Sequence, residues 1–344
     1  MERAVLDLLR GFGKDDAMLV VISGPDSPDL ACETICLSKP PGWKGRIDAV
    51  PSLYRKFRDA PNQAPIVAVG VWSFAACAIA CIFARRRVIL WEHSILTWRL
   101  RNELRVLVAA LMLRLFSPVL EHVVCVSAAS RVAVKYFVWP FSAITIIPNV
   151  VDIDHSHGAG GTKKRAPGQI RLVGLGSLSQ RKNWGLAIRA LTYLPQAYRL
   201  QIAGEGIERE GLERLIRQHG LSDRVELLGH IPRASRLLAD ADIMVHPSHA
   251  ETFGYSLFEA CEFGVPVVAL DKPVMNEVIP QVISGACARN SPADYANKIL
   301  EVAAQSVPLD QGSIGVRLQP FSRNQIRDLW REQLEDSRRS PGSP

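Results

Sequence analysis

Short runs of β-branched and aliphatic residues alternate with helical segments along most of this chain. In the first half these runs are AMLVVIS, APIVAVG, RVILWEHS, HVVCVS and AITIIPN, and the first helical segment is ERAVLDLLRGFG. Strands that are apolar throughout and are separated by helices pair in parallel, with helices on both faces of the sheet. The alternation therefore predicts an α/β fold.

The alternation breaks once, in the glycine-rich and charged stretch HSHGAGGTKKRAPGQ, and then resumes. The later strand candidates are IRLVGLG, YRLQIAGEG, RVELLGHIP, ADIMVHPS and GVPVVALD. A chain of 344 residues is long enough for two cores. We therefore expect an N-terminal Rossmann-like domain at residues 1–155, a linker at 156–169 and a second Rossmann-like domain at 170–320. In such doubly wound folds the ligand binds at the carboxyl ends of the strands, here in a cleft between the domains.

Charge and cysteine content narrow the class of protein. The formal net charge is +7, and nine Lys or Arg against three Asp or Glu fall between Arg85 and Lys135. The helical segment TWRLRNELRVLVAALMLRLFS in this region is basic and amphipathic, which favours peripheral contact with an anionic membrane over nucleic-acid binding. Seven cysteines without paired CxxC motifs predict reduced thiols and no zinc site. We expect a cytoplasmic protein, and a location at the inner face of the membrane stays open.

The stretch HAETFGYSLFEACEFGVPVVALD carries the most specific chemistry. Glu251 and Glu259 lie on either side of a predicted strand-to-helix turn that contains Gly254. Backbone amides at a helix start attract phosphate, and glycine lets the backbone approach a ligand closely. Carboxylates only accept hydrogen bonds when ionised, so they suit hydroxyl groups rather than phosphate. A diphosphate on the amides with a sugar and a ribose on the two acids predicts a nucleotide-sugar site.

These motifs, taken in order, resemble those of the retaining glycosyltransferases of family 4, which have the GT-B fold. The resemblance rests on the Glu-x7-Glu pair just described and on GSLSQRKNWGLAIRA, GLSDRVELLGHIP, IIPNVVD, EHS, VVCVS and NEVI. It implies two Rossmann-like domains that face a cleft, and a C-terminal helix, residues 321–337, that crosses back to the first domain. It also implies transfer of a hexose from a UDP- or GDP-linked sugar to a glycan or lipid-linked acceptor, in polysaccharide biosynthesis, without metal or cofactor.

The resemblance also assigns roles to single residues. It places Glu251 and His93 at the reaction centre as catalytic residues. It places Glu259 on the donor ribose and Lys182 on the diphosphate. The remaining donor-binding positions that it implies, or that adjoin these, are Phe253, Gly254, Tyr255 and Ser256 in the amide-rich turn, Ile231 near the base, and Ser177 and Arg181 in the phosphate segment.

The chain departs from the family pattern at three places. The first helix starts at Met1-Glu2-Arg3, so we expect the first strand and its Gly-Gly loop to be absent from the N-terminal domain. Ser177 stands where the family usually has arginine, and we expect Arg181 to supply that charge. Pro273-Val274 replaces a Gly-Gly pair in a loop that would contact the donor sugar.

Several other readings stay open at this point. The main alternative is a nucleotide-sugar-binding subunit that is catalytically impaired or depends on a partner, and a sugar-nucleotide epimerase is a second. The segment VGLGSLS is a near match to a dinucleotide-binding loop but lacks an acid about 20 residues later. The cluster Asp152, Asp154, His155 and His157 is expected to be a solvated loop rather than a metal site. The donor base, the sugar and the acceptor are not specified by these motifs.

Overall fold

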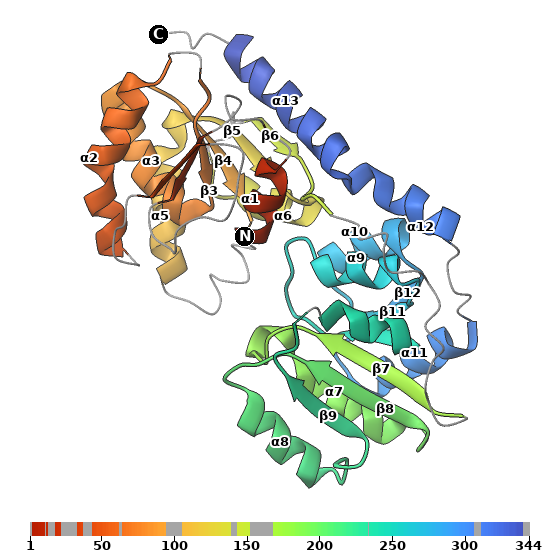
Figure 1. The fold of residues 1–344 in the computed structure, drawn as a ribbon. Helices are drawn as coiled ribbons and strands as arrows, with labels where there is room; N and C mark the ends of the chain where they lie inside the picture. Colours follow the sequence, from red (N-terminus) through yellow and green to blue (C-terminus); the bar gives the residue numbers. More distant parts are fainter. Residues whose placement is uncertain are drawn as a thin grey trace. The chain divides into compact units, whose positions relative to one another are not determined.

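The chain folds into two compact units, shown in the computed structural model of Figure 1. The first comprises Met1–Asp152 with Phe321–Pro344, and the second comprises Ile153–Pro320. The structure describes residues 2–10, 12, 18–21, 33–36, 43–61, 64–93, 105–138, 143–151, 168–232, 234–305 and 311–339.

The first unit contains six strands and six α-helices among its described residues, with the bounds that follow. They are α1 (Glu2–Leu9), β1 (Met18–Val21), β2 (Glu33–Cys36), α2 (Trp43–Asp59), β3 (Val67–Val69), α3 (Val71–Ala84), β4 (Val88–Glu92), α5 (Arg105–Phe116), η1 (Ser117–Val119), β5 (Leu120–Cys125), α6 (Ala128–Lys135), β6 (Ala143–Ile146) and α13 (Arg323–Arg339).

The strand pairs that the structure describes in the first unit are all parallel, as the alternating pattern predicts. Four strands form one sheet in the order β3-β4-β5-β6, and β1 pairs with β2 separately. The register places Leu90 of β4 opposite Val123 of β5, and Val123 opposite Ile144 of β6. The carboxyl ends of β4, β5 and β6 consequently lie along one edge of the sheet.

Successive side chains of β4 face the two sides of this sheet. Val88 and Leu90 join a core with Phe74 of α3 and Leu113 of α5. On the other side, the ring of Trp91 packs against Trp330 of α13 with centroids 4.9 Å apart. The helix α13 therefore completes the core of the first unit, although it lies at the far end of the sequence.

The second unit contains six strands and six α-helices among its described residues. They are β7 (Ile170–Leu175), η2 (Gln180–Lys182), α7 (Trp184–Ala190), η3 (Leu191–Tyr193), β8 (Tyr198–Ala203), α8 (Arg209–Gln218), β9 (Val225–Gly229), η4 (Ala234–Asp240), β10 (Ile243–His246), α9 (Tyr255–Glu262), β11 (Val267–Leu270), α10 (Pro273–Val282), β12 (Gly285–Ala288), α11 (Pro292–Gln305) and α12 (Gln311–Leu318), and η5 (Gln319–Phe321) follows α12 across the boundary of the units.

The strand order of the second unit fixes where a ligand can bind. Its six strands are all parallel and run β12-β11-β10-β7-β8-β9. The chain builds the sheet outward from β7 in one direction and then, from β10, in the other. The order therefore reverses between β7 and β10, and the loops that follow these two strands flank the switch point, where open α/β sheets bind ligands. The predicted α/β class, with two Rossmann-like units, is confirmed.

Glycines allow the loop after β7 to lie close to the loop after β8. A Cβ atom on Gly204 would stand 1.9 Å from the carbonyl oxygen of Gly176, so no side chain fits there. Close backbone packing of this kind fixes the path of the loop that leads from Gly176 to Lys182. The loop after β7 is one of the two that flank the switch point.

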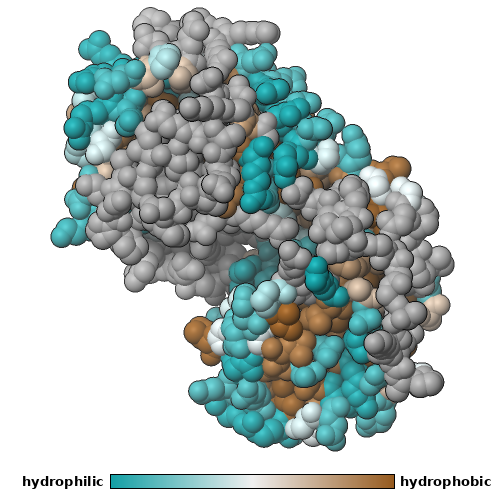
Figure 2. All heavy atoms as spheres, viewed as in Figure 1, coloured by the Kyte–Doolittle hydropathy of each residue, from teal (hydrophilic) through white to brown (hydrophobic). Residues whose placement is uncertain are grey.

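The described surface of the second unit is mixed in character. Figure 2 shows hydrophobic side chains gathered in one area of this unit, with hydrophilic side chains around it. Across the part of the chain that the structure describes, no helix has the length and apolar character needed to cross a bilayer.

Candidate functional site

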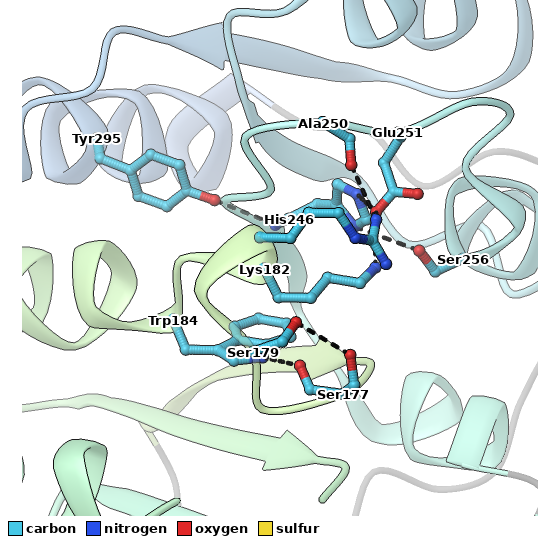
Figure 3. Close-up of polar contacts among 10 residues, drawn as sticks. Ser177, Ser179, Lys182, Trp184, His246, Ala250, Glu251, Ser256 and Tyr295 are labelled. Atoms are coloured by element: carbon cyan, nitrogen blue, oxygen red, sulfur yellow. Dashed lines mark hydrogen bonds and ion pairs between the residues drawn. The ribbon is translucent and has the colours of Figure 1, made fainter. Parts of the chain in front are cut away.

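The segment after β7 carries two cationic side chains to the switch point of the second unit. After Ser179 the chain makes the single turn η2, and Asn183 ends that turn with a left-handed φ of 53°. The indole Nε1 of Trp184 donates to the carbonyl of Ser177 at 3.0 Å and ties the turn to the core. Arg181 and Lys182 thereby point from the turn toward the segment that follows β10, as Figure 3 shows for Lys182.

Glu251, in the segment after β10, receives both cations. Its Oε1 accepts from Lys182 Nζ at 2.8 Å and from Arg181 Nη1 at 3.0 Å (Figure 3). Arg181 Nη1 also donates to the carbonyl of Ala250 at 2.9 Å. The side chains of Lys182 and Glu251 are only 11% and 12% exposed, whereas that of Arg181 is 41% exposed. The Lys182–Glu251 pair is thus a shielded ion pair, and Arg181 is its more exposed partner.

A third group, His246, faces the same carboxylate oxygen. His246 is the last residue of β10 and is fully buried, and its Nε2 lies 3.5 Å from Glu251 Oε1. Among the described residues, Lys182 and Arg181 are the side chains that hydrogen-bond to the Glu251 carboxylate and His246 Nε2 is within ion-pair distance of it, and all three approach Oε1. Oε2 therefore remains able to accept a hydrogen bond from a ligand.

The neighbouring charges determine the protonation state of the cluster. Burial by itself would raise the pKa of Glu251, but the contacts with His246, Lys182 and Arg181 outweigh it and hold the pKa well below its usual value. Burial lowers the pKa of His246, and the nearby Lys182 lowers it further. At neutral pH the cluster then holds one carboxylate, two cations and a neutral imidazole, and its net positive charge favours an anion.

The helix α9 begins directly beyond this cluster. Its N-cap is Gly254, with φ of 81°, and no side chain caps the first turn. A left-handed φ favours glycine, so the residue type fits the sharp entry into the helix. Backbone amides at such a start, together with the helix dipole, bind phosphate groups well. Lys182, Arg181 and the start of α9 thus combine in one region of the second unit.

Two residues that sequence reasoning did not select, His246 and Tyr295, hold the end of β10 in place. The Tyr295 hydroxyl, from α11, donates to the carbonyl of Val268 at 2.6 Å and accepts from the backbone N–H of His246 at 3.1 Å. The imidazole Nδ1 lies 3.2 Å from Ser256 Oγ at the start of α9. The signal available in the sequence was a histidine within an otherwise apolar strand, directly before Pro247-Ser248.

The structure gives different surroundings to the other predicted residues of this unit. The side chain of Phe253 is buried and stacks on Phe258 at 4.5 Å, so only its backbone remains for a ligand. Tyr255 packs edge-on against Phe253 at 5.2 Å. Ser177 Oγ lies 3.2 Å from Ser179 Oγ on the exposed side of the loop after β7.

Glu259 and Ile231 lie outside the cluster around Glu251. Glu259 is half-buried on α9, one turn beyond the start of that helix, and Ile231 is half-buried just after β9. The ribose role of Glu259 and the base role of Ile231 stay predictions.

His93 belongs to the first unit, where it follows β4 at the carboxyl edge of the sheet. Its ring lies against Trp91 with centroids 4.5 Å apart, and its Nε2 has no hydrogen-bond partner among the described residues. Burial lowers the pKa of His93 to about 3, so the imidazole is neutral at physiological pH. A neutral imidazole can donate or accept a hydrogen bond but supplies no charge.

Metal ligands are not grouped in the part of the chain that the structure describes. No set of three or more His, Cys, Asp or Glu side chains comes together there in a way that could hold a metal ion. The sequence cluster of residues 152–157 and most of the predicted linker, residues 156–167, lie outside the described residues.

Two family models match this chain and together cover most of it. The model for glycosyl transferases group 1 matches residues 162–311. The model for glycosyltransferase family 4 matches residues 1–155. The first match contains the whole cluster of Arg181, Lys182, His246 and Glu251.

Curated relatives share parts of the sequence. The GPI3 subunit of phosphatidylinositol N-acetylglucosaminyltransferase from Saccharomyces cerevisiae is 27% identical over 238 residues, which are 65% of this chain and 48% of the relative. A GDP-mannose-dependent alpha-(1-6)-phosphatidylinositol dimannoside mannosyltransferase from Mycobacterium tuberculosis is 37% identical over 145 residues, which are 40% of this chain and 37% of the relative. The chain therefore spans about half the length, or less, of these relatives.

Solved structures with the same fold cover nearly the whole chain. Anabaena HepE in complex with UDP aligns with a TM-score of 0.76 at 20% identity, over 97% of this chain and 96% of that one. The lipopolysaccharide outer core galactosyltransferase WaaB aligns with a TM-score of 0.75 at 14% identity, over 97% and 95%. The predicted GT-B architecture is confirmed, and the chain belongs to family 4 of the glycosyltransferases, in the group 1 class.

Proposed function

We propose that this protein is a retaining glycosyltransferase that moves a hexose from a nucleotide-diphosphate sugar to a hydroxyl group of a glycan or lipid-linked acceptor. The observation that carries the proposal is the shielded cluster in which Lys182 and Arg181 meet Oε1 of Glu251 beside the start of α9. The family already implies use of a nucleotide sugar. The finer points, namely retention, the roles of single residues and the acceptor, are argued below.

The leaving diphosphate is the group that most needs stabilisation. When the bond between the sugar and the diphosphate breaks, negative charge grows on the diphosphate, and fixed cations and amide donors stabilise it. Lys182 and Arg181 provide the cations, and the start of α9, with Gly254 and Ser256, provides the amides. Arg181 thereby takes the place of the arginine that the family usually has at position 177.

The two glutamates differ in their surroundings, which supports different roles. Glu251 keeps Oε2 available, and we assign that oxygen to a hydroxyl of the transferred sugar at the reaction centre. Glu259 lies one turn into α9, and we assign it to the ribose hydroxyls, with Ile231 near the base. The acceptor hydroxyl then attacks from the face that the diphosphate leaves, so the anomeric configuration is retained. His93 takes part as a neutral hydrogen-bonding group near the transferred sugar.

The transfer assay provides the direct test. Purified protein is screened with UDP- and GDP-linked hexoses by thermal shift, because a bound ligand raises the apparent stability by mass action. A donor that binds is then assayed for transfer to lipid-linked and free glycan acceptors, and the anomeric configuration of the product is read by NMR. A product of inverted configuration would refute retention, and the absence of any stabilising nucleotide sugar would refute the whole proposal.

A second candidate follows from the name of one relative. The yeast relative is described as a subunit, which favours a partner-dependent form of the same chemistry. A chain of this kind binds the nucleotide sugar but does not turn it over alone. Stabilisation by a donor without transfer or donor hydrolysis would favour this candidate over the free-standing enzyme.

The exposed side chains of helix α5 in the first unit favour an acceptor that is located in a membrane. Helices α3, α5 and α6 contain no acidic residue at all. On α5, Leu107, Leu111 and Leu115 are 52%, 62% and 61% exposed, and Arg114 lies on the same side of this helix. Exposed leucines beside cations are typical of surfaces that lie on anionic headgroups. The two relatives are named for phosphatidylinositol substrates, which fits such a location.

Two helices that adjoin α5 carry exposed apolar and basic side chains as well. Arg131, Val132, Lys135 and Tyr136 are exposed on or just after α6. Arg114 of α5 donates to the carbonyl of Val138 at 3.3 Å, so α5 and the end of α6 are neighbours. Ile82 and Phe83 add exposed apolar area at the end of α3, which packs against α5.

Liposome flotation tests the membrane proposal. The wild type is expected to float with vesicles that contain anionic lipid and to remain in solution with neutral vesicles. Leu111→Ser with Leu115→Ser should reduce flotation severalfold, whereas Ile207→Ser, an exposed apolar residue of the second unit, should not. Flotation that does not depend on anionic lipid, or equal flotation of both variants, would contradict this proposal while leaving the transferase proposal intact.

A further inference from the structure

His246 occupies a position that the proposed chemistry does not require. It is fully buried, and it ends a strand whose other members, Ile243, Met244 and Val245, are apolar and buried as well. A leucine would fill this space with less desolvation. The imidazole instead lies between two polar groups of the site, Ser256 Oγ at 3.2 Å and Glu251 Oε1 at 3.5 Å.

The surrounding charges determine which ring nitrogen carries the proton. The groups that face the imidazole are Glu251 from the segment before α9, Ser256 from α9, and Lys182 with Arg181 from the turn after β7, while Tyr295 from α11 meets its backbone. Burial and Lys182 keep the ring neutral, so it has one N–H. A lone pair on Nε2 would face the Glu251 carboxylate, and two acceptors repel each other. The proton therefore belongs on Nε2, and Nδ1 is left as an acceptor.

This tautomer fixes the hydroxyl of Ser256. With Nδ1 unprotonated, the hydrogen bond at 3.2 Å requires Ser256 to donate its O–H to His246. A serine hydroxyl has one proton and two lone pairs. Once the proton is used, Ser256 Oγ presents only lone pairs to a ligand, which favour a hydroxyl or N–H group and disfavour a phosphate oxygen.

We propose that His246 is a positioning residue that directs its Nε2–H toward Glu251 and accepts a hydrogen bond from the hydroxyl of Ser256. Ser256 then acts toward the nucleotide sugar only as a hydrogen-bond acceptor. The inference rests on the proposed function, since it concerns how the same site reads a nucleotide sugar. It assigns Ser256 to a hydroxyl of the donor, while the backbone amides of the turn keep the diphosphate. The aromatic hydroxyl of Tyr295 holds the backbone of His246, which keeps the imidazole in register with both partners.

The tautomer can be observed without any enzymatic assay. In ¹⁵N-labelled protein the chemical shifts of the two ring nitrogens distinguish a protonated from an unprotonated nitrogen, and His246 is assigned by the signal that disappears in His246→Asn. The expected result is a neutral ring with the proton on Nε2 at pH 7. A proton on Nδ1, or a doubly protonated ring, would overturn the proposal whatever the protein does to nucleotide sugars.

Binding measurements test the consequence for Ser256. The probes are inorganic pyrophosphate and the nucleotide sugar that stabilises the wild type. In Ser256→Ala the affinity for the nucleotide sugar should fall about five- to tenfold, the effect of one hydrogen bond, while the affinity for pyrophosphate stays unchanged. A matching loss for pyrophosphate would mean that the hydroxyl donates to phosphate, and no loss for either probe would mean that it contacts no ligand. Both results overturn the proposal.

Two substitutions of His246 separate positioning from filling of space. His246→Asn places an amide oxygen near the position of Nδ1, so it can still accept from Ser256, whereas His246→Leu fills the space without any polar group. The Asn variant is expected to keep most of the preference for the nucleotide sugar over pyrophosphate, and the Leu variant to lose it. Equal preference in both variants would overturn the proposal. The Ser256→Ala variant should unfold at a somewhat lower temperature than the wild type, because Nδ1 of the buried His246 loses its hydrogen-bond donor. It keeps the test valid if a His246 variant does not fold.

Discussion

At the residue scale, a single carboxylate oxygen organises the site. Oε1 of Glu251 meets Lys182, Arg181 and His246, which come from the segments after β7 and from β10. The strand-to-helix turn in the sequence pointed to Glu251, whereas Lys182 and its neighbour Arg181 were selected through the resemblance to the family. Neither could reveal that the cations meet this acid, since about 70 residues separate the partners along the chain.

Replacing Glu251 by glutamine should separate catalysis from nucleotide binding. Glu251→Gln removes one negative charge from a cluster with two cations, so a nucleoside diphosphate should bind at least as tightly as to the wild type. Transfer should fall about 100-fold, the typical effect of losing one preorganised polar group at a reaction centre. Isothermal titration with the nucleoside diphosphate and steady-state kinetics with the donor measure the two effects.

Replacing Lys182 should have the opposite effect on binding. Lys182→Ala removes the buried cation and leaves Glu251 with less compensation, so both diphosphate affinity and transfer should fall at least tenfold. Lys298→Ala serves as the matched control, because Lys298 pairs with Glu301 on α11 at 2.7 Å, away from the cluster. Equal affinity for the nucleoside diphosphate in the Lys182 variant and the wild type would argue against a diphosphate role.

Histidines whose pKa is lowered by burial, His93 and His246 among them, should make the protein less stable in mild acid. The pKa of His93 is lowered to about 3 and that of His246 is lowered as well, both mainly by burial. In the unfolded chain these side chains take up protons near pH 6.5, whereas in the folded chain they stay neutral. Above about pH 6.5 these histidines are neutral in both states and do not lower the free energy of unfolding. Below about pH 6.5 the free energy of unfolding should fall by up to about 1.4 kcal/mol per pH unit for each such histidine.

Urea unfolding at pH 7 and at pH 5 measures this effect. His93→Asn should show a smaller loss between the two pH values than the wild type, since it removes one of the groups whose pKa burial lowers. His219→Asn, at an exposed position on the end of α8, should keep the wild-type loss. An unchanged loss in the His93 variant would show that other groups control the acid sensitivity.

At the element scale, two glycines of the second unit should respond in opposite ways to substitution by alanine. A Cβ on Gly204 would lie 1.9 Å from a backbone oxygen of the loop after β7, whereas Gly211 lies within α8, where a Cβ meets only the end of Arg214 at 4.0 Å. Gly204→Ala should destabilise the second unit by more than about 2 kcal/mol, because backbone must move. Gly211→Ala should stabilise it by about 0.5–1 kcal/mol through helix propensity. Thermal and urea unfolding of the two variants give both signs.

The elements also show how far residue patterns predict this fold. Strands that are apolar and bounded by turns, such as β4, β7, β10 and β11, follow directly from the sequence, because burial on both faces requires apolar side chains. The strands β2 and β12, with the sequences ETIC and GACA, were not predicted. GACA has little strand propensity and becomes a strand because it pairs with β11 at the edge of the sheet. Such a strand depends on tertiary pairing, which periodicity does not contain.

The same limit applies to the site. Gly254 and the start of α9 were predictable, since glycine before an apolar helix marks a turn. His246 and Tyr295 were not predicted, because a lone histidine in an apolar strand and a lone tyrosine on a helix are usually core residues. Their hydrogen bonds to Ser256 and Val268 depend on how α9, α11 and β11 pack around the end of β10.

At the scale of the whole molecule, the two ends of the chain share one unit. Trp330 of α13 is 2% exposed and packs on Trp91 of β4, and Ile326 of the same helix is 1% exposed. The backbone N–H of Val151 donates to the carbonyl of Phe321 at 2.9 Å, so the chain is hydrogen-bonded to the first unit at the residue where it returns to that unit. The first unit therefore lacks part of its core until α13 is in place.

Trp330→Ala tests this dependence. Truncating a buried tryptophan costs about 3–5 kcal/mol, and the loss should fall on the first unit, since the neighbours of Trp330 lie there. Calorimetry should show the transition of the first unit at a lower temperature, while the second unit keeps its own transition. The second unit holds Lys182 and Glu251, so the shift of its transition by a nucleoside diphosphate should stay as in the wild type.

The control for Trp330→Ala lies on the same helix. Arg327→Ala removes a side chain that pairs with Asp328 on the surface, and exposed pairs contribute at most about 1 kcal/mol. This variant should unfold like the wild type. If Trp330→Ala instead lowered both transitions equally and weakened diphosphate binding, α13 would act as a support of the whole chain. An effect limited to the first transition would mean that α13 is a part of the N-terminal core, and that this core is complete only once α13 has been made.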